Sequence, residues 1–188
     1  MTHVSIIGSG NMGQAIAKVV TDGGSTVETL GHGEAPSGDV VVLAVPYAAV
    51  ADIVAQQGAA LAGKVVVDIT NPLDLATFDA LVVPAGSSAA AEIAAALPQS
   101  RVLKAFNTTF AATLASGTVG PLPTTVLIAG DDADAKALLA QVVEAGGLRA
   151  VDAGSLARAH ELEAIGFLQL TLAVGEKVSW TGGFGVVA

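Results

Sequence analysis

The sequence predicts an α/β fold in which a doubly wound, mostly parallel sheet is covered by helices and followed by a long C-terminal helix. Short runs rich in valine and isoleucine alternate with segments of helical periodicity. Hydrophobic residues make up 52% of the 188 residues and aromatic residues only 4%, which suits parallel strands packed under helices of small residues. The first apolar run, residues 4–7, ends in a glycine-rich turn that opens a helix.

This turn reads Gly8-Ser9-Gly10-Asn11-Met12-Gly13, a GxGxxG spacing between a predicted strand and a predicted helix. Each glycine has a physical role when a dinucleotide binds in such a turn. The first permits the tight turn, the second leaves room for a pyrophosphate, and the third lets the helix approach the sheet. The helix then offers its first N–H groups and the positive end of its dipole to the phosphates. The pattern therefore favours a Rossmann-like, dinucleotide-binding fold over a plain βα turn.

The second strand is predicted at residues 26–30, and its tip would meet the adenosine ribose of a bound coenzyme. An acid at that tip accepts a hydrogen bond from a free 2′-hydroxyl, whereas a basic or hydroxyl group there favours a 2′-phosphate. The tip reads Leu30-Gly31-His32-Gly33, with Glu28 too early and Glu34 too late. This favours NADP over NAD, and His32 is either a phosphate contact or a solvated loop residue.

The next strand is predicted at residues 39–45 and is buried along its whole length. The link over residues 31–38 contains three glycines and a proline, so no crossover helix fits there. A link of about eight residues can stretch to ~27 Å. That length is enough to return along the sheet and cross two strand spacings of ~4.8 Å. The adenosine side of the pocket would then be thinly walled.

Three predicted strands, residues 39–45, 64–69 and 101–106, end in small polar residues or proline. The carboxyl ends of parallel strands meet at one edge of the sheet, where open α/β folds bind ligands. Ordinary turn chemistry accounts for any one of these strand ends but not for all three together. The side chains expected to line the resulting cleft are Pro46, Thr70, Asn71, Asn107 and Thr108.

The remaining elements follow from periodicity and capping signals. Ser87 and Ser88 are candidate N-caps, Asp131-Asp132 opens a helix and Gly146-Gly147 closes it. The long connection over residues 73–86 is expected to lie over the cleft as a wall or lid. The predicted helices are 48–57, 89–97, 133–145 and 156–179, and the further strands are 124–129 and 148–152.

The whole chain, residues 1–188, is predicted to be a single dinucleotide-binding domain, with residues 156–188 serving dimerisation. The apolar residues of the last helix point in most directions around its axis, so one monomer cannot cover them all. This predicts a symmetric homodimer centred on that helix. The apolar, glycine-rich tail over residues 180–188 is expected to pack rather than fray.

Composition excludes several classes of function. The chain has 17 acidic and 8 basic residues and a net charge of −9, without a basic cluster, so nucleic acid and anionic membranes are not expected as partners. It has no cysteine, which excludes disulfides and thiolate chemistry, and its three histidines lie far apart, so no metal site is expected. Neither a signal-peptide pattern nor an apolar stretch of ~20 residues occurs. The default expectation is a soluble cytoplasmic protein.

Several segments together resemble the deazaflavin-dependent NADP oxidoreductase family. Besides the glycine loop, they are Val42-Leu43-Ala44-Val45-Pro46, Val67-Asp68-Ile69-Thr70-Asn71-Pro72 and Lys104-Ala105-Phe106-Asn107-Thr108. Further matches at residues 128–132, 151–154 and 161–163 extend the resemblance over essentially the whole chain. The chain looks closest to the short members described only as dinucleotide-binding oxidoreductases. The family's members transfer a hydride between NADP(H) and coenzyme factor 420, a deazaflavin, and form dimers through their C-terminal helices.

The resemblance implies where the coenzyme would lie. The pyrophosphate is expected on residues 9–12, and a 2′-phosphate near Gly31 and His32. The family usually has Ser-Arg or Thr-Arg at this strand tip, followed by a helix, so Gly31-His32 and a short loop are a departure that puts a strong NADP preference in question. The expected cofactor-binding residues are Gly8, Ser9, Gly10, Asn11, Met12, Gly31, His32, Ala44, Val45, Pro46, Thr70, Asn71 and Asn107.

Hydride transfer between a nicotinamide and a flavin-type ring needs two flat rings face to face, with the reacting carbons about 3–3.5 Å apart. The cofactors carry the chemistry, while the protein supplies position, electrostatics and exclusion of water. No general acid is required, which agrees with a cleft that lacks cysteine, histidine and carboxylate. Asn107 is expected to hydrogen-bond either the carboxamide or the acceptor's carbonyl edge, or alternatively to cap the next turn. The sequence therefore predicts an NAD(P)H-dependent oxidoreductase whose acceptor is a deazaflavin, a flavin or a similar small molecule.

Two other functions fit part of the pattern. A reductase of hydroxy acids or imines would need a proton donor and a large helical second domain, and too little chain follows Asn107 for such a domain. A non-catalytic NADP(H)-sensing dimer would use the same glycine loop. Coenzyme oxidation that depends on an added deazaflavin or flavin would distinguish the enzyme from the sensor.

Overall fold

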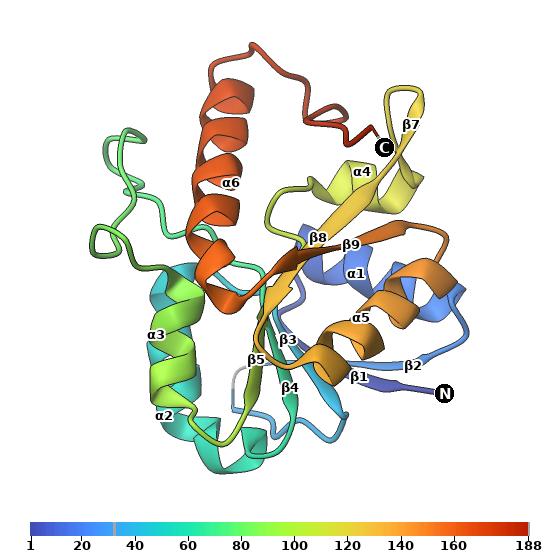
Figure 1. The fold of residues 1–188 in the computed structure, drawn as a ribbon, viewed down its shortest axis with the longest axis vertical. Helices are drawn as coiled ribbons and strands as arrows, with labels where there is room; N and C mark the ends of the chain where they lie inside the picture. Colours follow the sequence, from blue (N-terminus) through green and yellow to red (C-terminus); the bar gives the residue numbers. More distant parts are fainter. Residues whose placement is uncertain (32, 188) are drawn as a thin grey trace.

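The computed structural model describes residues 1–31 and 33–187, and a seven-stranded sheet forms its centre (Figure 1). The strand order is β2-β1-β3-β4-β5-β8-β9, and every neighbouring pair is parallel except β5 and β8. The Rossmann-like, mostly parallel sheet predicted from the sequence is therefore confirmed. The strands are β1 (His3–Ile7), β2 (Thr26–Leu30), β3 (Val40–Leu43), β4 (Val65–Asp68), β5 (Arg101–Lys104), β8 (Thr125–Gly130) and β9 (Arg149–Gly154).

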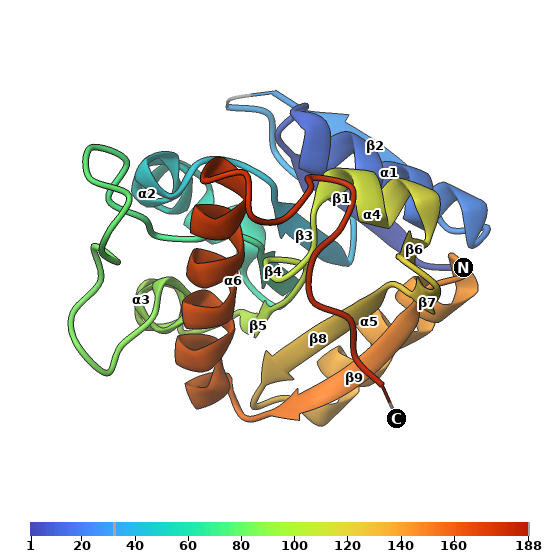
Figure 2. The ribbon, with the colours of Figure 1, turned by 90° about the horizontal axis from the view of Figure 1, so that it is seen from above.

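Helices cover both faces of this sheet (Figure 2). One face carries α1 (Asn11–Asp22), α4 (Ala111–Ser116) and α5 (Ala133–Ala145), and the other carries α2 (Val50–Leu61) and α3 (Ala89–Ala96). Successive side chains of a strand point to opposite faces, so each strand supplies both cores. In β3, for example, Val40 and Val42 pack in one core, and Val41 and Leu43 in the other.

The link from β2 to β3 crosses β1, and its described residues contain no helix, as the sequence predicts. A Cβ added at Gly38 would lie 2.7 Å from the carbonyl oxygen of His3, so the chain passes here within contact distance of β1. Glu28 fixes this crossing by accepting hydrogen bonds from the hydroxyl of Ser5 and from the N–H of Ser37, the latter at 2.8 Å. These hydrogen bonds lower the pKa of Glu28 to about 2.

The sequence predicts no element for the region between β5 and β8. It contains α4 and a small hairpin of β6 (Thr118–Val119) and β7 (Leu122–Pro123). Because this short segment turns back instead of crossing over the sheet, β8 runs antiparallel to β5. Other differences are shifts of a few residues at element ends, such as the 3₁₀ turn over Tyr47–Ala49 that precedes α2.

The predicted helix over residues 156–179 is too long at its C-terminal end. It begins with a 3₁₀ turn over Leu156–Arg158 and continues as α6 (Ala159–Val174), which ends at Gly175. The tail then turns back towards α4 and β7 (Figure 1). The ring of Trp180 packs against Phe110 with centroids 5.0 Å apart, and the N–H of Phe184 donates to Gln169 at 2.9 Å. The described part of the tail therefore lies against α4 and α6, as expected, although Trp180 and Phe184 stay 50% and 43% exposed.

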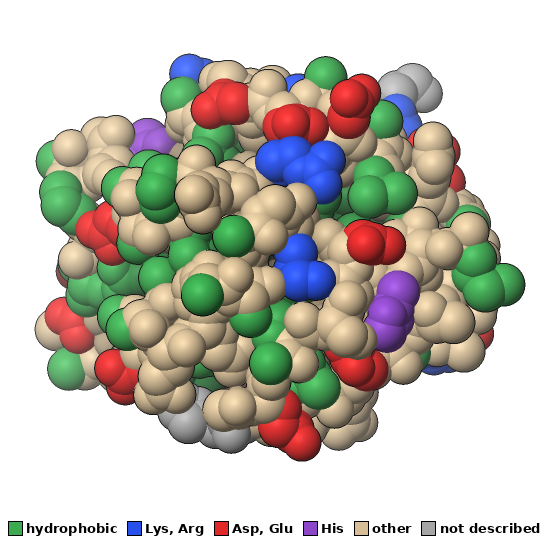
Figure 3. Space-filling model, turned by 90° about the horizontal axis from the view of Figure 1, so that it is seen from below, with side chains coloured by type: hydrophobic (Ala, Val, Ile, Leu, Met, Phe, Trp, Pro, Cys, Tyr) green, Lys and Arg blue, Asp and Glu red, His purple; other side chains and the backbone are tan. Residues whose placement is uncertain are grey.

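The surface agrees with the acidic composition. On the face that Figure 3 shows, acidic side chains are scattered among apolar and neutral ones, and basic side chains are fewer. None of the described helices combines the length and the apolarity that crossing a membrane requires.

Candidate functional site

The three glycines of the loop between β1 and α1 have different surroundings. Gly8 has a φ of +118°, and a Cβ added there would lie 2.2 Å from the carbonyl oxygen of Ala44. A Cβ at Gly13 would lie 2.2 Å from the carbonyl oxygen of Gly8, whereas a Cβ at Gly10 would meet no atom of the described residues within 4 Å. The first and third glycines therefore permit close packing, and the second faces open space, as the GxGxxG pattern predicts.

The N-terminus of α1 is open to an anion. Its N-cap is Gly10, no side chain among the described residues caps it, and no acidic residue stands in its first turn. The helical ladder begins with the N–H of Gln14 donating to the carbonyl of Gly10 at 3.0 Å. The preceding N–H groups of the first turn have no partner within the helix, and the helix dipole adds positive potential in front of them.

A cavity of about 690 Å³ lies in front of this helix end, at the carboxyl ends of β3, β4 and β5. One wall comes from the connection 73–86 through Leu73, Leu75 and Phe78, and another from α6 and the tail through Leu170 and Trp180. The connection is thus a wall of the cavity, as expected. The cavity brings together these sequence-predicted residues: Gly10, Asn11, Met12, Ala44, Val45, Pro46, Thr70, Asn71 and Asn107.

Other expected site residues lie elsewhere. Ser9 does not line the cavity, and its carbonyl accepts a hydrogen bond from the side chain of Gln14 at 2.9 Å. Thr108 is buried beside α6, where its carbonyl accepts a hydrogen bond from Gln169, and the next residue, Thr109, lines the cavity instead. Gly31 stands just beyond the end of β2. The expected contact at His32 lies outside the described residues.

A pair of asparagines closes the floor of the cavity. The side-chain N–H₂ group of Asn107 donates to Oδ1 of Asn71 at 2.9 Å and to the carbonyl of Leu162 at 2.8 Å. The side-chain N–H₂ group of Asn71 donates back to the carbonyl of Asn107 at 3.1 Å. A Cβ at Gly166 of α6 would lie 2.2 Å from Oδ1 of Asn71, so this glycine lets α6 reach the pair.

Two buried oxygens of the cavity residues have no hydrogen-bond partner among the described residues. They are Oδ1 of Asn107 and Oγ1 of Thr70. An unpaired buried polar group costs about 1–3 kcal/mol, and both oxygens are shielded from solvent, so a ligand could reach them only if neighbouring side chains moved. Both N–H groups of the Asn107 amide are already used, so Asn107 offers only an acceptor. The alternative role of Asn107 as a turn cap is not observed, because the turn N–H of Thr109 donates to Phe106 instead.

The backbone is strained just before this asparagine. Phe106 is buried and has a φ of 63°, a left-handed conformation that costs a bulky residue about 1–3 kcal/mol. Its carbonyl accepts hydrogen bonds from both the N–H and the hydroxyl of Thr109, at 3.1 and 2.7 Å. The sharp turn after β5 places Asn107 against α6.

A buried ionic cluster supports the cavity floor from below. The ammonium group of Lys104 contacts the carboxylates of Asp68 at 2.7 Å and of Glu163 at 2.8 Å, and all three side chains are fully buried. Lys104 also donates to the carbonyl of Thr70 at 2.6 Å, and Asp68 accepts from the N–H of Thr70 at 2.8 Å. Glu163 accepts from the N–H of Ala89 at the start of α3. Burial raises the pKa of Glu163, against the opposing attraction of Lys104.

The sequence did not reveal this cluster as a unit. Its three members are far apart in the chain and meet only because β4 lies beside β5 and α6 packs over both strand ends. The sequence does show a lysine and an aspartate within two apolar strands that are predicted to be buried. Because a buried charge requires a partner, these two residues indicate an ionic contact there.

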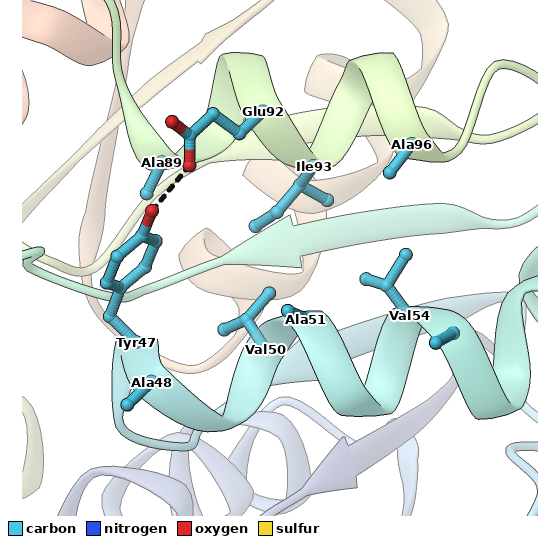
Figure 4. Close-up of a pocket in the computed structure, with 10 residues that line it drawn as sticks. Tyr47, Ala48, Val50, Ala51, Val54, Ala89, Glu92, Ile93 and Ala96 are labelled. Carbon is cyan, nitrogen blue, oxygen red and sulfur yellow. Dashed lines mark hydrogen bonds between the residues drawn. The ribbon is translucent and has the colours of Figure 1, made fainter. Parts of the chain in front are cut away.

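A second cavity, of about 510 Å³, lies between α2 and α3 (Figure 4). Its walls are mostly alanine and valine, and the hydroxyl of Tyr47 hydrogen-bonds Glu92 at one end. Burial and the adjacent Glu92 raise the pKa of Tyr47 to about 12. Tyr47 borders both cavities, but the strand ends and the glycine loop face only the first. Among the described residues, no group of three or more histidines and carboxylates could hold a metal ion.

The doubly wound sheet, the glycine loop at the start of α1 and the cavity at the strand ends define a Rossmann-type dinucleotide-binding protein. Comparisons with known proteins make the assignment more specific. Residues 20–72 match the family model described as NADP oxidoreductase, coenzyme F420-dependent. The chain is 33% identical over 152 residues to the F420-dependent NADP reductase of Methanocaldococcus jannaschii, covering 79% of this chain and 68% of that protein. The chain therefore belongs to the F420-dependent NADP oxidoreductase family and is an oxidoreductase.

A second curated relative agrees with this assignment, and a solved structure agrees with the fold. The F420-dependent NADP reductase of Methanothermobacter marburgensis is 32% identical over 154 residues, covering 79% of this chain and 68% of that protein. A crystal structure from Arthrobacter sp. FB24, assigned provisionally as an F420-dependent NADP reductase, superposes over 100% of both chains with a TM-score of 0.87 and 22% identity. This structural similarity confirms the fold over the full length of the chain.

Proposed function

We propose that this protein transfers a hydride between NADP(H) and a deazaflavin, a flavin or a similar small acceptor in the cavity at the strand ends. One observation carries the proposal. The open N-terminus of α1 and the ends of three neighbouring strands face the same cavity of about 690 Å³. A volume of that size falls within the range of small-molecule and cofactor sites.

The residues of the cavity fit a dinucleotide. The space in front of Gly10 is what a pyrophosphate would require, and the N–H groups of the first turn of α1 would bind it. Oδ1 of Asn107, which is unpaired and shielded in this structure, would accept a hydrogen bond from a carboxamide N–H once the side chains that cover it move aside. The acceptor's carbonyl edge does not suit Asn107, because both of its N–H groups are used by Asn71 and Leu162.

A reduced nicotinamide supplies the hydride, so this chain has to hold two rings in contact and keep water away. Val45, Pro46 and Ile69 give the strand-end side of the cavity an apolar surface against which a flat ring can lie. Leu73, Phe78 and Trp180 face the cavity from other segments and would enclose an acceptor ring. Neither a histidine nor a carboxylate lines the cavity among the described residues, which agrees with a hydride transfer that uses no protein acid.

The proposal includes a homodimer formed through α6. Ile165 and Leu168 are 36% and 51% exposed, although they lie in the middle of this helix. Together with the exposed Ala164, they form an apolar stripe one turn long, because residues three and four apart share a helix face. A second copy of the chain would cover this stripe by a two-fold contact.

The test is to add NADPH to the protein and follow the loss of reduced-nicotinamide absorbance while coenzyme F420, flavins and quinones are supplied in turn. We expect oxidation that depends on one of these acceptors. Binding of NADPH without oxidation by any of them would favour the sensing dimer instead.

Gly10→Val is the matching variant. Its side chain would fill the pyrophosphate space, and since no atom in the described part of the chain lies within 4 Å of the added Cβ, the fold should survive. We expect NADPH affinity to fall about a hundredfold, roughly 2.7 kcal/mol. Gly10→Ala should cause a smaller loss, and circular dichroism and the thermal midpoint check the fold. Normal NADPH binding by Gly10→Val would show that the loop does not hold the coenzyme.

A further inference from the structure

The carboxylate of Glu34 lies at the tip of β2, where the adenosine ribose of a dinucleotide is bound in this fold class. Its Oε2 accepts a hydrogen bond from the N–H of Gly31, the residue that follows the strand. The carbonyl of Leu30, one residue earlier, accepts the N–H of Gly8 at 3.1 Å. Glu34 is therefore hydrogen-bonded to Gly31, the residue next to Leu30, and Leu30 is where the tip of β2 contacts the glycine loop.

The short link is what brings Glu34 back to this tip. The sequence places Glu34 four residues beyond the end of β2, too late for an acid on a straight strand. The described residues of the link form no helix, and the chain turns at Gly33, which has a φ of +89°. The other acid of this region, Glu28, is not available to a coenzyme, because it is engaged by Ser5 and Ser37 at the crossing of β1.

The N–H of Gly31 is a group that a 2′-phosphate would use, and here a carboxylate of the chain already occupies it. A phosphate monoester carries about −1.5 to −2 charge at pH 7, so it would be repelled by a carboxylate in contact with the same N–H. None of the ion pairs among the described residues joins a lysine or arginine to Glu34. A free 2′-hydroxyl, by contrast, can donate a hydrogen bond to a carboxylate.

We infer that Glu34 is a determinant of coenzyme specificity, whose carboxylate favours the 2′-hydroxyl of NAD(H) and opposes the 2′-phosphate of NADP(H). The inference rests on the proposed function, since it assumes that the dinucleotide lies along the glycine loop and β2. It refines that function in one respect: the protein should accept NADH as well as NADPH, whereas the family resemblance implies NADP(H).

The experiment measures dissociation constants of NADPH and NADH, from the fluorescence of the reduced nicotinamide, for the wild-type protein and for Glu34→Gln. Gln keeps the size of the side chain and removes its charge. We expect the ratio of NADH to NADPH dissociation constants to rise about tenfold in Glu34→Gln, through tighter NADPH binding and weaker NADH binding. Glu144→Gln is the matched control, because it removes the same charge from an exposed site on α5 and should leave the ratio unchanged.

Adenosine 2′,5′-bisphosphate and 5′-AMP isolate the adenosine end of the site from the nicotinamide end. Glu34→Gln should bind the bisphosphate about threefold to fivefold more tightly and 5′-AMP no better than the wild-type protein does. If Glu34→Gln binds both coenzymes and its ratio of dissociation constants stays within twofold of the wild-type ratio, the role of Glu34 is wrong. The proposed function would still stand. If the wild-type protein binds neither coenzyme, the proposed function and this inference are both wrong.

Discussion

At the residue scale, Glu28 shows how one side chain stabilises an unusual connection. Its carboxylate accepts hydrogen bonds from β1 and from the link that crosses β1, and the pKa of Glu28 falls from 4.5 to about 2. A folded-state pKa below the unfolded value means that the carboxylate contributes stability above pH 4.5 and loses that contribution as the pH falls towards 2.

Glu28→Gln should therefore flatten the acid limb of the stability profile. Between pH 4.5 and pH 2, we expect the free energy of unfolding of the wild-type protein to fall by about 1 kcal/mol more than that of the variant. The expected difference in unfolding free energy is small because solvent reaches this carboxylate. Urea unfolding at several pH values measures it, with Glu144→Gln as the control for a change of charge. Parallel profiles for wild type and Glu28→Gln would contradict this role.

The residues of the glycine loop could be predicted from the sequence because spacing and local context define their roles. The partners of Asn107 could not, because its hydrogen bonds reach Asn71 and Leu162, which are 36 and 55 residues away. The same holds for the ion pair of Lys104 with Glu163. Long-range polar contacts depend on how elements pack, and a single sequence gives only the requirement that buried polar groups find partners.

At the scale of elements, α6 can approach the strand ends because Gly166 has no side chain. Gly166 faces the asparagine pair, and an added Cβ would overlap Oδ1 of Asn71. Glycine within a helix ordinarily costs about 0.5–1 kcal/mol relative to alanine. Its presence here is explained by the close approach of α6 to the strand ends.

Gly166→Ala and Gly58→Ala form a matched pair that tests this explanation. The Cβ at Gly58, inside α2, would make an ordinary contact with Leu97 at 3.5 Å, so this variant should be more stable by about 0.5–1 kcal/mol. Gly166→Ala should instead be less stable by about 1–3 kcal/mol and bind NADPH more weakly, because α6 must move away from Asn71 and Asn107. Chemical denaturation and coenzyme titration give both quantities. Equal stabilisation by the two variants would show that α6 is not constrained at this position.

Strands and helices with strong periodicity could be predicted to within a few residues, and α5 agrees over its full range. The failures have local causes. The pattern predicts too long a helix over residues 156–179 because apolar residues continue past Gly175, where the chain turns back and Glu176 adopts a φ of 57°. The segment with α4 and the hairpin carries weak signals, since β6 and β7 have only two residues each.

At the scale of the whole molecule, the doubly wound, mostly parallel sheet and the crossing without a helix could be predicted, but the reversed direction of β8 could not. Strand direction there depends on the short return through α4 and the hairpin, which leaves no mark on the pattern of β8 itself. The expectation that the chain acts as a homodimer stays a prediction.

Leu168→Glu tests that expectation. A charge in the middle of the apolar stripe of α6 should convert the dimer to a monomer, because the carboxylate would be buried without a partner at the contact. Val82→Glu is the control, since Val82 is similarly exposed, 53% against 51%, but lies in the connection 73–86. Sedimentation velocity distinguishes the two states. A monomeric wild-type protein would refute the dimer outright.

The central claim is that main-chain N–H groups at the start of α1 bind the diphosphate of a nicotinamide coenzyme in an acidic protein. A crystal structure with oxidised coenzyme bound tests it most directly. We expect the diphosphate within hydrogen-bond distance of the N–H groups of residues 10–12 and the nicotinamide at the ends of β3, β4 and β5. A coenzyme bound elsewhere, such as in the cavity between α2 and α3, with the turn at Gly10 empty, would contradict the account.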